Sequence, residues 1–561
     1  MFDAIVIGSG ISGGIAAKEL CERGLKTLVI ERGGKVEHGA SYNDWMQPWD
    51  LPNAGYIPEE ELQRDYAVQR NCYAMNSASK QFWVKDSEHP YSTPADKPFE
   101  WIRGYQLGGR SLTWGRQSYR LSAMDFEANA KDGHGSDWPI RYDDLAPWYD
   151  HVEKFIGVAG SKEGLAQLPD GEFLPAFDLN DAEKEFKKRV EAKFPTRKVI
   201  PGRVANLSEA QPHHEALGRN SCQNRSICER GCSYGAYHSS LSSSLPAAEA
   251  TGNLTIVTDA IVHSIVYDPK TRKATGVRVI DSNTKAGRTY EAKLVFGCAS
   301  AIGTAQILLN SKSEAFPAGI ANSSDQVGRN LMDHLYGLIT AGFFSKGPNT
   351  TYVGRRPTGL YIPRYRNVTE SADFVRGYGF QGGVSRMGWH TTALSFPGVG
   401  ASLKARTRKP GAWIASVAGF GEMLPHPDNR VTLHASKRDK WGIPLVHIEC
   451  EARENDLKMA KQISADGKEI IEAAGGKVMY ETTALGPPGR GIHEMGTARM
   501  GTDPRNSVLN KYSQAHEVSN LFITDGSAMA SGGCQNPSLT YMALSARAAH
   551  HAAEFLKEGK I

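Results

Sequence analysis

Long hydrophobic runs are missing from this chain of 561 residues, and we expect no leader segment. No stretch of about 18 consecutive apolar residues occurs, so the sequence predicts no membrane-spanning helix. The strand-like residues 4–7 begin three residues after Met1, which leaves no room for a signal peptide. Taken alone, the chain is therefore expected to be cytoplasmic.

A strong charge of either sign is also missing. Lys and Arg number 65 against 61 Asp and Glu, a net charge of only +4. No dense basic run is present, which excludes a polybasic nucleic-acid-binding arm, and we expect no nucleic-acid partner. The composition, with 40% hydrophobic residues and 58 glycines, is typical of a folded globular enzyme. The length favours two domains over one core.

Cysteine is scarce. Five of the eight cysteines are scattered, which is typical of small buried side chains in a reducing compartment. The other three, Cys222, Cys228 and Cys232, lie within eleven residues. Three thiolates can hold three irons of an iron–sulfur cluster, the reading that we favour. Alternatives are a zinc site completed by His238, because structural zinc normally has four ligands, or a loop of free thiols or one disulfide.

The first thirty residues predict a strand, a helix and a second strand, at 2–7, 13–23 and 25–30, which form a βαβ unit. Residues 41–99 are rich in Pro, Asn, Trp and Tyr without periodicity, and predict an excursion over the surface or the active site. Further helices are expected at 145–155, 182–194, 301–309 and 454–473, further strands at 254–257, 261–267 and 294–296, and a sheet-rich region at roughly 345–480.

A glycine motif links the first strand to the first helix. In G-x-G-x-x-G, Gly8 permits the tight turn, Gly10 lets the backbone approach a pyrophosphate, and Gly13 allows close packing of helix and strand. The helix N-terminus then offers free N–H groups to the phosphates. Glu31 follows Gly13 by eighteen residues, where an acid is expected to bind ribose hydroxyls. The motif predicts a dinucleotide site but does not separate FAD from NAD.

Other stretches carry a family resemblance. Together with the glycine motif, three further stretches form a pattern that resembles the glucose–methanol–choline (GMC) oxidoreductases. They are Leu107-Gly108-Gly109-Arg110-Ser111, the run from His493 to Gly501, and Asp525-Gly526. Residues 301–309 and 327–334 add to the resemblance, which covers about half of the chain.

The resemblance implies the fold. We expect an α/β Rossmann-like flavin-binding domain and a second α+β substrate domain built on a mainly antiparallel sheet. The flavin domain is expected from 1–40, 100–125, 250–340 and 485–561, the substrate domain from 126–249 and 341–484 with a cysteine insertion near 220–240, and the excursion from 41–99.

The resemblance also implies site residues. His493 matches the family's catalytic histidine, and Asn536 stands where its partner is expected. A neutral imidazole suits removal of a hydroxyl proton, and an amide can hydrogen-bond the same oxygen. The alternative to this substrate-binding role is that Asn536 acts only as a helix N-cap.

The flavin-binding residues form a second implied set: Gly8, Gly10, Gly13, Glu31, Gly108, Gly109, Ser111, Asp525 and Gly526. Some sugar-oxidising relatives carry a flavin-linking histidine two residues beyond the serine of the glycine loop. Thr113 holds this place here, so we expect FAD to be bound without a covalent bond.

The cysteine spacing is similar to that of bacterial sugar dehydrogenase subunits with a three-iron [3Fe-4S] cluster. This implies export to the periplasm with a small subunit that bears the export signal, and a cytochrome or other acceptor for electrons. The residue pattern of 101–120 and 222–245 resembles that of glucoside 3-dehydrogenases, which oxidise the C3 hydroxyl of glucosides. One alternative is oxidation at C1 or C2 of a sugar, as in a glucose, gluconate or fructose dehydrogenase or a pyranose oxidase. The others are a non-redox FAD lyase and a non-catalytic binding subunit.

Overall fold

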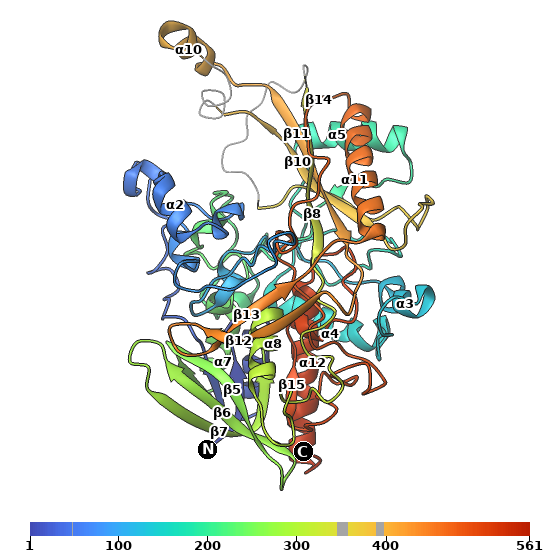
Figure 1. Cartoon of the computed structure of the whole chain (residues 1–561). Coiled ribbons are helices and arrows are strands. Elements are labelled where there is room, and N and C mark those ends of the chain that lie inside the picture. The colour runs from blue at the N-terminus through green and yellow to red at the C-terminus, as the bar shows by residue number, and fades with distance from the viewer. Residues whose placement is uncertain (48, 345–356, 389–397) are drawn as a thin grey trace.

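The computed structural model describes residues 1–47, 49–344, 357–388 and 398–561. Two large sheets divide the molecule (Figure 1): one lies at the end that carries both termini, and the other extends toward the opposite end. Within the described residues, no helix is long and apolar enough to cross a membrane.

The terminal sheet has seven strands, in the order β4-β2-β1-β7-β6-β5 with β15 also paired to β7. Five of them run parallel, namely β1 (Phe2–Ile7), β2 (Thr27–Ile30), β4 (Leu254–Val257), β7 (Gly287–Gly297) and β15 (Leu521–Ile523). The other two, β5 (Ala260–Asp268) and β6 (Lys273–Asp281), form an antiparallel meander with the first half of β7. Helices α1 (Ile11–Glu22) and α12 (Ser538–Lys557) pack together beside this sheet. The predicted βαβ unit is confirmed.

The second sheet has six antiparallel strands in the order β14-β8-β11-β10-β9-β3. They are β14 (Lys477–Glu481), β8 (His334–Phe344), β11 (Trp413–Glu422), β10 (Tyr378–Arg386), β9 (Leu360–Ile362) and β3 (Ile200–Pro201). Helix α11 (Glu454–Ala473) covers one face, where Met459, Ile463 and Ile470 are buried in the core. A parallel-stranded domain beside an antiparallel one is the fold class that the sequence predicts.

The remaining elements surround these layers. A hairpin of β12 (Arg430–Arg438) and β13 (Pro444–Glu449) packs on α8 (Ala301–Asn310). The other helices are α2 (Glu59–Asp65), α3 (Ala123–Asp132), α4 (Tyr142–Ile156), α5 (Asp181–Lys193), α6 (Pro212–Glu215), α7 (Leu245–Glu249) and α10 (Gly400–Thr407). The helices expected at 145–155, 182–194, 301–309 and 454–473 are all present, within a few residues at each end.

The division into domains stays a prediction. The expected limit at residue 340 falls inside β8, which pairs with β11 between His334 and Phe344 with one register shift. The expected substrate segment 341–484 also includes residues 345–356 and 389–397, which lie outside the described residues. In segment 41–99 the described residues form α2 and short 3₁₀ turns, and Tyr73 and Trp83 reach the central cavity described next.

Candidate active site

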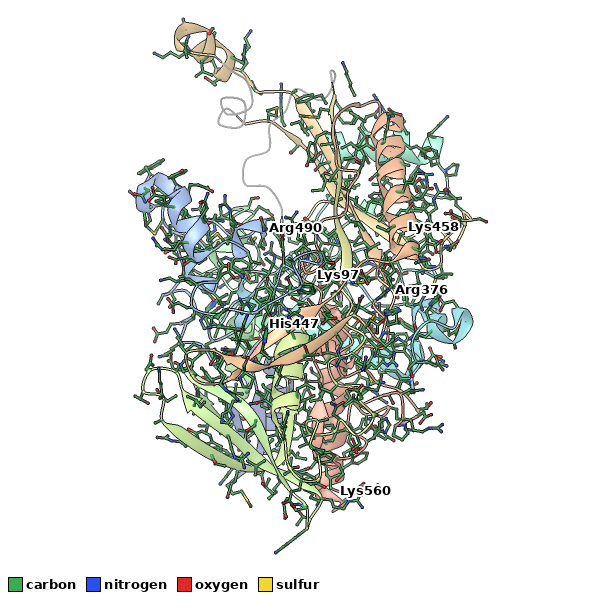
Figure 2. All side chains as sticks on the ribbon, viewed as in Figure 1. Lys97, Arg376, His447, Lys458, Arg490 and Lys560 are labelled. Atoms are coloured by element: carbon green, nitrogen blue, oxygen red, sulfur yellow. The ribbon has the colours of Figure 1, made fainter. Side chains whose placement is uncertain are left out.

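A cavity of about 770 Å³ lies between the two sheets. Parallel α/β sheets bind ligands beyond the carboxyl ends of their strands, and Gly8 and Glu31 line the cavity just after β1 and β2. His493 and Asn536 line it as well, together with Gln381 of the six-stranded sheet. The cavity is therefore lined by the predicted catalytic pair and by all the predicted dinucleotide residues except Gly13 and Gly108. Arg490 also lines it, and Figure 2 places this side chain near the middle of the molecule.

The three motif glycines have different steric roles. Gly8 has a φ of +97°, a conformation that favours glycine. A Cβ atom on Gly13 would lie 1.9 Å from the Gly8 carbonyl oxygen, so helix and strand can pack this closely only without a side chain. A Cβ atom on Gly10 would meet nothing within 4 Å, because Gly10 borders the open cavity. This space fits a pyrophosphate that approaches the backbone.

Ser9, which the sequence reasoning missed, connects the motif to its surroundings. Its hydroxyl donates a 2.6 Å hydrogen bond to Glu31 Oε2 and accepts a 2.9 Å bond from the Gly108 N–H. Burial raises the pKa of the Glu31 carboxyl, while the bonds from Ser9 and Gly33 oppose this rise. The acid is thereby fixed at the end of β2, beside the glycine loop.

The second glycine loop touches the first. The Cβ position of Gly109 lies 3.4 Å from the Gly10 Cα atom, and Gly108 has a φ of +88°. The buried Ser111 hydroxyl donates to the Gly108 carbonyl at 2.6 Å and accepts from the Ser240 N–H at 3.0 Å. Ser111 thus stabilises the loop by bonds within the protein, and it also lines the cavity.

Asp525 and Gly526 close the site from the C-terminal part of the chain. Asp525 follows β15, and its carboxylate accepts from Thr304 Oγ1 at 2.5 Å and from the Ser527 N–H at 2.9 Å. Burial raises its pKa. A Cβ atom on Gly526 would lie 2.3 Å from the Glu494 carbonyl oxygen, so glycine is required here. Two glycine loops, two acids and an open space at Gly10 together fit the ribose and pyrophosphate of FAD.

A second histidine fixes the tautomer of His493. His334 Nε2 lies 2.8 Å from the Gly533 carbonyl oxygen, which can only accept, so this nitrogen carries the proton. In the neutral ring His334 Nδ1 is then an acceptor, and it lies 2.7 Å from His493 Nδ1. His493 must therefore carry its proton on Nδ1, and its Nε2 lone pair is left as a base.

Both imidazoles are neutral at neutral pH. Burial lowers the pKa of His493 well below 6.5, and the neighbouring His334 and Arg110 lower it further. Burial likewise lowers the pKa of His334 to about 4. The proton-accepting form of His493 is therefore the resting form.

Asn536 presents a hydrogen-bond donor next to this base. Its Oδ1 accepts from Gln381 Nε2, which turns the amide NH₂ toward His493 Nε2 at 3.4 Å. The N-cap residue of α12 is Pro537, so Asn536 is not the helix cap. A substrate hydroxyl at this point can donate its proton to His493 and accept a hydrogen bond from Asn536.

Asp333 holds the segment that carries His493. Its Oδ2 accepts from the N–H groups of Gly489 and Gly491, at 2.8 and 2.9 Å, and its Oδ1 accepts from the His493 N–H at 2.9 Å. Burial, with a contribution from the Glu494 charge, raises the pKa of Asp333 to about 6. Asp333 and His334 end the stretch 327–334 that carries part of the family resemblance, which was the signal that could have revealed them.

Comparisons with known proteins agree with this geometry. Family models described as GMC oxidoreductase match residues 187–336 and 425–545. The chain belongs to the GMC oxidoreductase family. It is an FAD-dependent oxidoreductase that acts on CH–OH donors.

Relatives of this GMC oxidoreductase span nearly its whole length. A 2-methyl-1,2-propanediol dehydrogenase of Mycolicibacterium austroafricanum is 29% identical over 97% of this chain and 94% of the relative. A fructose dehydrogenase large subunit of Gluconobacter japonicus is 28% identical over 99% and 98%. A paromamine 6'-oxidase of Streptomyces fradiae is 26% identical over 98% and 91%.

Solved structures share the fold. A formate oxidase of Aspergillus oryzae superimposes with a TM-score of 0.62 at 14% identity, covering 99% of both chains. A pyridoxine 4-oxidase of Mesorbium loti does so with a TM-score of 0.59 at 17% identity, covering 98% of both.

The three clustered cysteines of this GMC oxidoreductase are partly exposed and unpaired. Burial raises the pKa of Cys222 to about 11, and the charges of Cys228 and Cys232 add to this rise, so the three thiols lie within electrostatic reach of one another. Across the described part of the chain, however, no group of three or more His, Cys, Asp or Glu side chains could hold a metal ion. The zinc alternative with His238 gains no support.

The motif glycines yield a matched pair of variants. Gly13→Ala places a methyl group against backbone and should lower the free energy of unfolding by about 1–3 kcal/mol. Gly10→Ala should change the stability of flavin-free protein by less than about 0.5 kcal/mol, because its φ is −67° and its Cβ meets open space. It should still weaken FAD binding, since the methyl group enters the phosphate space. Thermal unfolding and FAD titration measure the two effects, and undiminished FAD affinity in Gly10→Ala would contradict the assignment.

The histidine pair gives a prediction about pH. Because protonation of His493 removes the accepting lone pair and its pKa lies below 6.5, kcat/KM should stay level as the pH falls to 6.5 and should decline only at lower pH. His493→Ala should retain FAD, lose this acid limb and lower kcat by roughly 10²–10⁴-fold. A variant within about threefold of the parent rate would remove His493 from the role of base.

Proposed function

We propose that this protein is a dehydrogenase that oxidises a secondary alcohol of a sugar or glycoside, with the C3 hydroxyl of glucosides, giving 3-keto-glucosides, as the preferred candidate. The observation that carries the proposal is the pairing of a neutral His493 Nε2 acceptor with the Asn536 Nδ2 donor, 3.4 Å apart, at the wall of the cavity. Oxidation of an alcohol needs this combination, because the hydroxyl loses its proton as the carbonyl forms.

The proton and the electrons leave the substrate separately. The hydroxyl proton goes to His493 Nε2, while the carbinol C–H bond breaks with its electron pair. The residues of the two glycine loops would hold FAD, which would supply the acceptor for this hydride equivalent. Two electrons and two protons leave the alcohol in total. Asn536 holds the substrate oxygen, and Asp333 and His334 keep His493 oriented. Because Thr113 stands in place of a linking histidine, we propose that the FAD is bound without a covalent bond.

The residues that line the cavity support the proposal that the substrate is polyhydroxylated. Tyr73, Trp114, Tyr336 and Phe420 supply aromatic faces, against which the C–H faces of a sugar ring can pack. Gln381 lies among them and already orders the Asn536 amide. Named relatives that act on fructose and on the aminoglycoside paromamine also support a sugar or glycoside. Oxidation at C1 or C2 and non-redox lyase chemistry remain the alternatives for the test below.

We further propose that electrons leave through an iron–sulfur cluster, a [3Fe-4S] centre on Cys222, Cys228 and Cys232. The position of the thiols relative to the cavity supports this exit. Arg116 lines the cavity, and of all the charges that act on it, that of Cys228 contributes most. Trp114 also lines the cavity, and its Nε1–H donates a 2.9 Å hydrogen bond to the His238 carbonyl, six residues beyond Cys232.

The three thiols are compared with what a single metal ion and a cluster of several irons each require. One metal ion about 2.3 Å from each sulfur requires sulfurs close together, and the described residues offer no such group. A cluster of several irons spreads its thiolates more widely. Similarity to a fructose dehydrogenase large subunit supports a partner subunit. We further propose that this partner is small and carries the export signal to the periplasm, and that a cytochrome or another acceptor receives the electrons.

Anaerobic flavin reduction tests the proposed activity. Sugars, glycosides and simple diols should be added one at a time under exclusion of oxygen, and bleaching of the flavin absorbance should be followed. Glucosides should bleach it, and NMR of the product should show a ketone at C3. A flavin that stays oxidised while the sugar is converted would establish the lyase, and a product oxidised at C1 or C2 would reassign the position.

Iron content and spectroscopy test the electron exit. The protein should contain about three irons per chain and give an iron–sulfur electron paramagnetic resonance signal when oxidised. Cys228→Ser should lose the signal and most turnover with the natural acceptor, yet its flavin should still bleach with substrate, because substrate oxidation precedes electron exit. The scattered Cys450→Ser is the matched control and should keep the signal. Iron-free protein with full activity toward its natural acceptor would contradict the cluster.

A further inference from the structure

A polar side chain of the six-stranded sheet faces the catalytic pair. Gln381 lies within β10, where it pairs with Ala418 of β11. Paired residues of adjacent strands point to the same face of a sheet, and so does Phe420, two positions beyond Ala418. The Phe420 ring centroid is 6.1 Å from that of His493. Gln381, Ala418 and Phe420 all line the cavity, so this face of the sheet borders the reaction site.

A series of hydrogen bonds connects Gln381 to the carbonyl that sets the tautomer of His493. The Gly533 carbonyl accepts from His334 Nε2, and His334 Nδ1 accepts from His493 Nδ1. The remaining ring nitrogen of His493 is an acceptor, so the Asn536 amide presents its NH₂ group to it and its Oδ1 to Gln381. Only a donor can bind this oxygen, and the Gln381 atom that faces Asn536 is therefore Nε2.

The other end of the Gln381 amide is left as an acceptor. Its Oε1 has no hydrogen-bond partner in the part of the chain that the structure describes, and the side chain lines the cavity. A carbonyl oxygen only accepts, so a substrate group that binds here must donate. In a second cavity glutamine, Gln117, the corresponding oxygen is already used, because the Tyr119 hydroxyl donates to it at 2.6 Å. An open acceptor thus distinguishes Gln381 from Gln117.

We propose that Gln381 Oε1 binds a second hydroxyl of the substrate, on the carbon next to the one that is oxidised, and that this contact selects vicinal diols, including those of sugar rings, over simple alcohols. It rests on the proposed alcohol oxidation and deepens it by naming the second group that is recognised.

The spacing of the protein groups fits such a diol. Vicinal hydroxyl oxygens are separated by roughly one hydrogen-bond length, and Asn536 and Gln381 are themselves joined by one hydrogen bond. One hydroxyl can therefore reach His493 and Asn536 while its neighbour donates to Gln381. The neighbouring hydroxyl keeps its proton throughout, so the balance of electrons and protons in the oxidation is unchanged.

Deoxy analogues of the substrate test this contact. The kcat/KM of methyl glucoside is compared with those of its 2-deoxy and 4-deoxy analogues, each of which lacks one hydroxyl beside C3. In the parent, loss of the bound hydroxyl should lower kcat/KM by about 10- to 100-fold. In Gln381→Met, which has no acceptor, this ratio should shrink by about tenfold or more, since differences in intrinsic reactivity are common to both proteins and cancel. A product oxidised at another carbon moves the deoxy positions to the neighbours of that carbon.

Two matched variants separate this contact from the ordering of Asn536. Gln381→Glu keeps acceptor oxygens but loses the N–H that orders Asn536, so kcat should fall for every substrate while the preference for the hydroxyl stays. Gln117→Met removes the cavity glutamine whose acceptor is already used, and it should keep the preference as well. FAD content and thermal unfolding establish that each variant is folded. If Gln381→Met does not fold, Gln381→Ala replaces it in the same comparison.

The outcomes separate the contact from the proposed activity. If glucosides bleach the flavin but the ratio is unchanged in Gln381→Met, or if the parent oxidises both deoxy analogues as well as methyl glucoside, the contact is overturned and the activity stands. Bleaching by 1,2-propanediol, but by neither 2-propanol nor any sugar, would overturn the sugar substrate and support the diol contact. Equal bleaching by 1,2-propanediol and 2-propanol, with none by sugars, would overturn both. Failure of both Gln381→Met and Gln381→Ala to fold would make Gln381 a structural residue and would also overturn the contact.

Discussion

The 2.7 Å hydrogen bond between the Nδ1 atoms of His334 and His493 is the interaction on which the chemistry of the site depends. Two acceptor nitrogens would repel each other, so one must donate, and the Gly533 carbonyl decides which by binding the Nε2–H of His334. These proton positions leave the accepting lone pair of His493 on Nε2, the nitrogen beside Asn536. A backbone carbonyl thus determines which atom of the site is basic, without any charged partner for the imidazole.

The neutral state of the base matches the proposed reaction, although charged side chains lie nearby. Burial keeps both imidazoles neutral, and the ion pair between Arg110 and Glu494, 2.8 Å long, lies along the same segment. Asp333 uses both carboxylate oxygens on backbone N–H groups and so holds the loop rather than the imidazole. Orientation of His493 therefore comes from the loop backbone, and its tautomer comes from His334.

Close backbone contacts join the distant parts of the flavin site. Gly10 and Gly109 touch at the cavity, Ser9 bridges Glu31 and Gly108, and Gly526 packs on the Glu494 carbonyl. Each contact joins residues that lie between 22 and 99 positions apart in the chain.

The sequence by itself determined the local parts of this protein. Gly8, Gly10 and Gly13 with Glu31 predicted the βαβ unit, because turn, helix and strand preferences act within a few residues. The family resemblance placed His493 and Asn536 in one site, and the structure brings them together. It also pointed to the antiparallel second sheet, although the limit at residue 340 lies inside β8, since pairing with β11 extends that strand to His334.

Only the tertiary structure decided the roles of His334, Asp333 and Ser9. His334 precedes His493 by 159 residues, and no local pattern shows that their rings meet. The hydrogen bond from the Gly108 N–H to the Ser9 hydroxyl likewise joins residues that are 99 positions apart. Tautomers, orphaned donors and buried charges depend on the three-dimensional surroundings of a side chain. Short-range sequence patterns carry no record of those surroundings, which is the physical reason that they emerged from the fold alone.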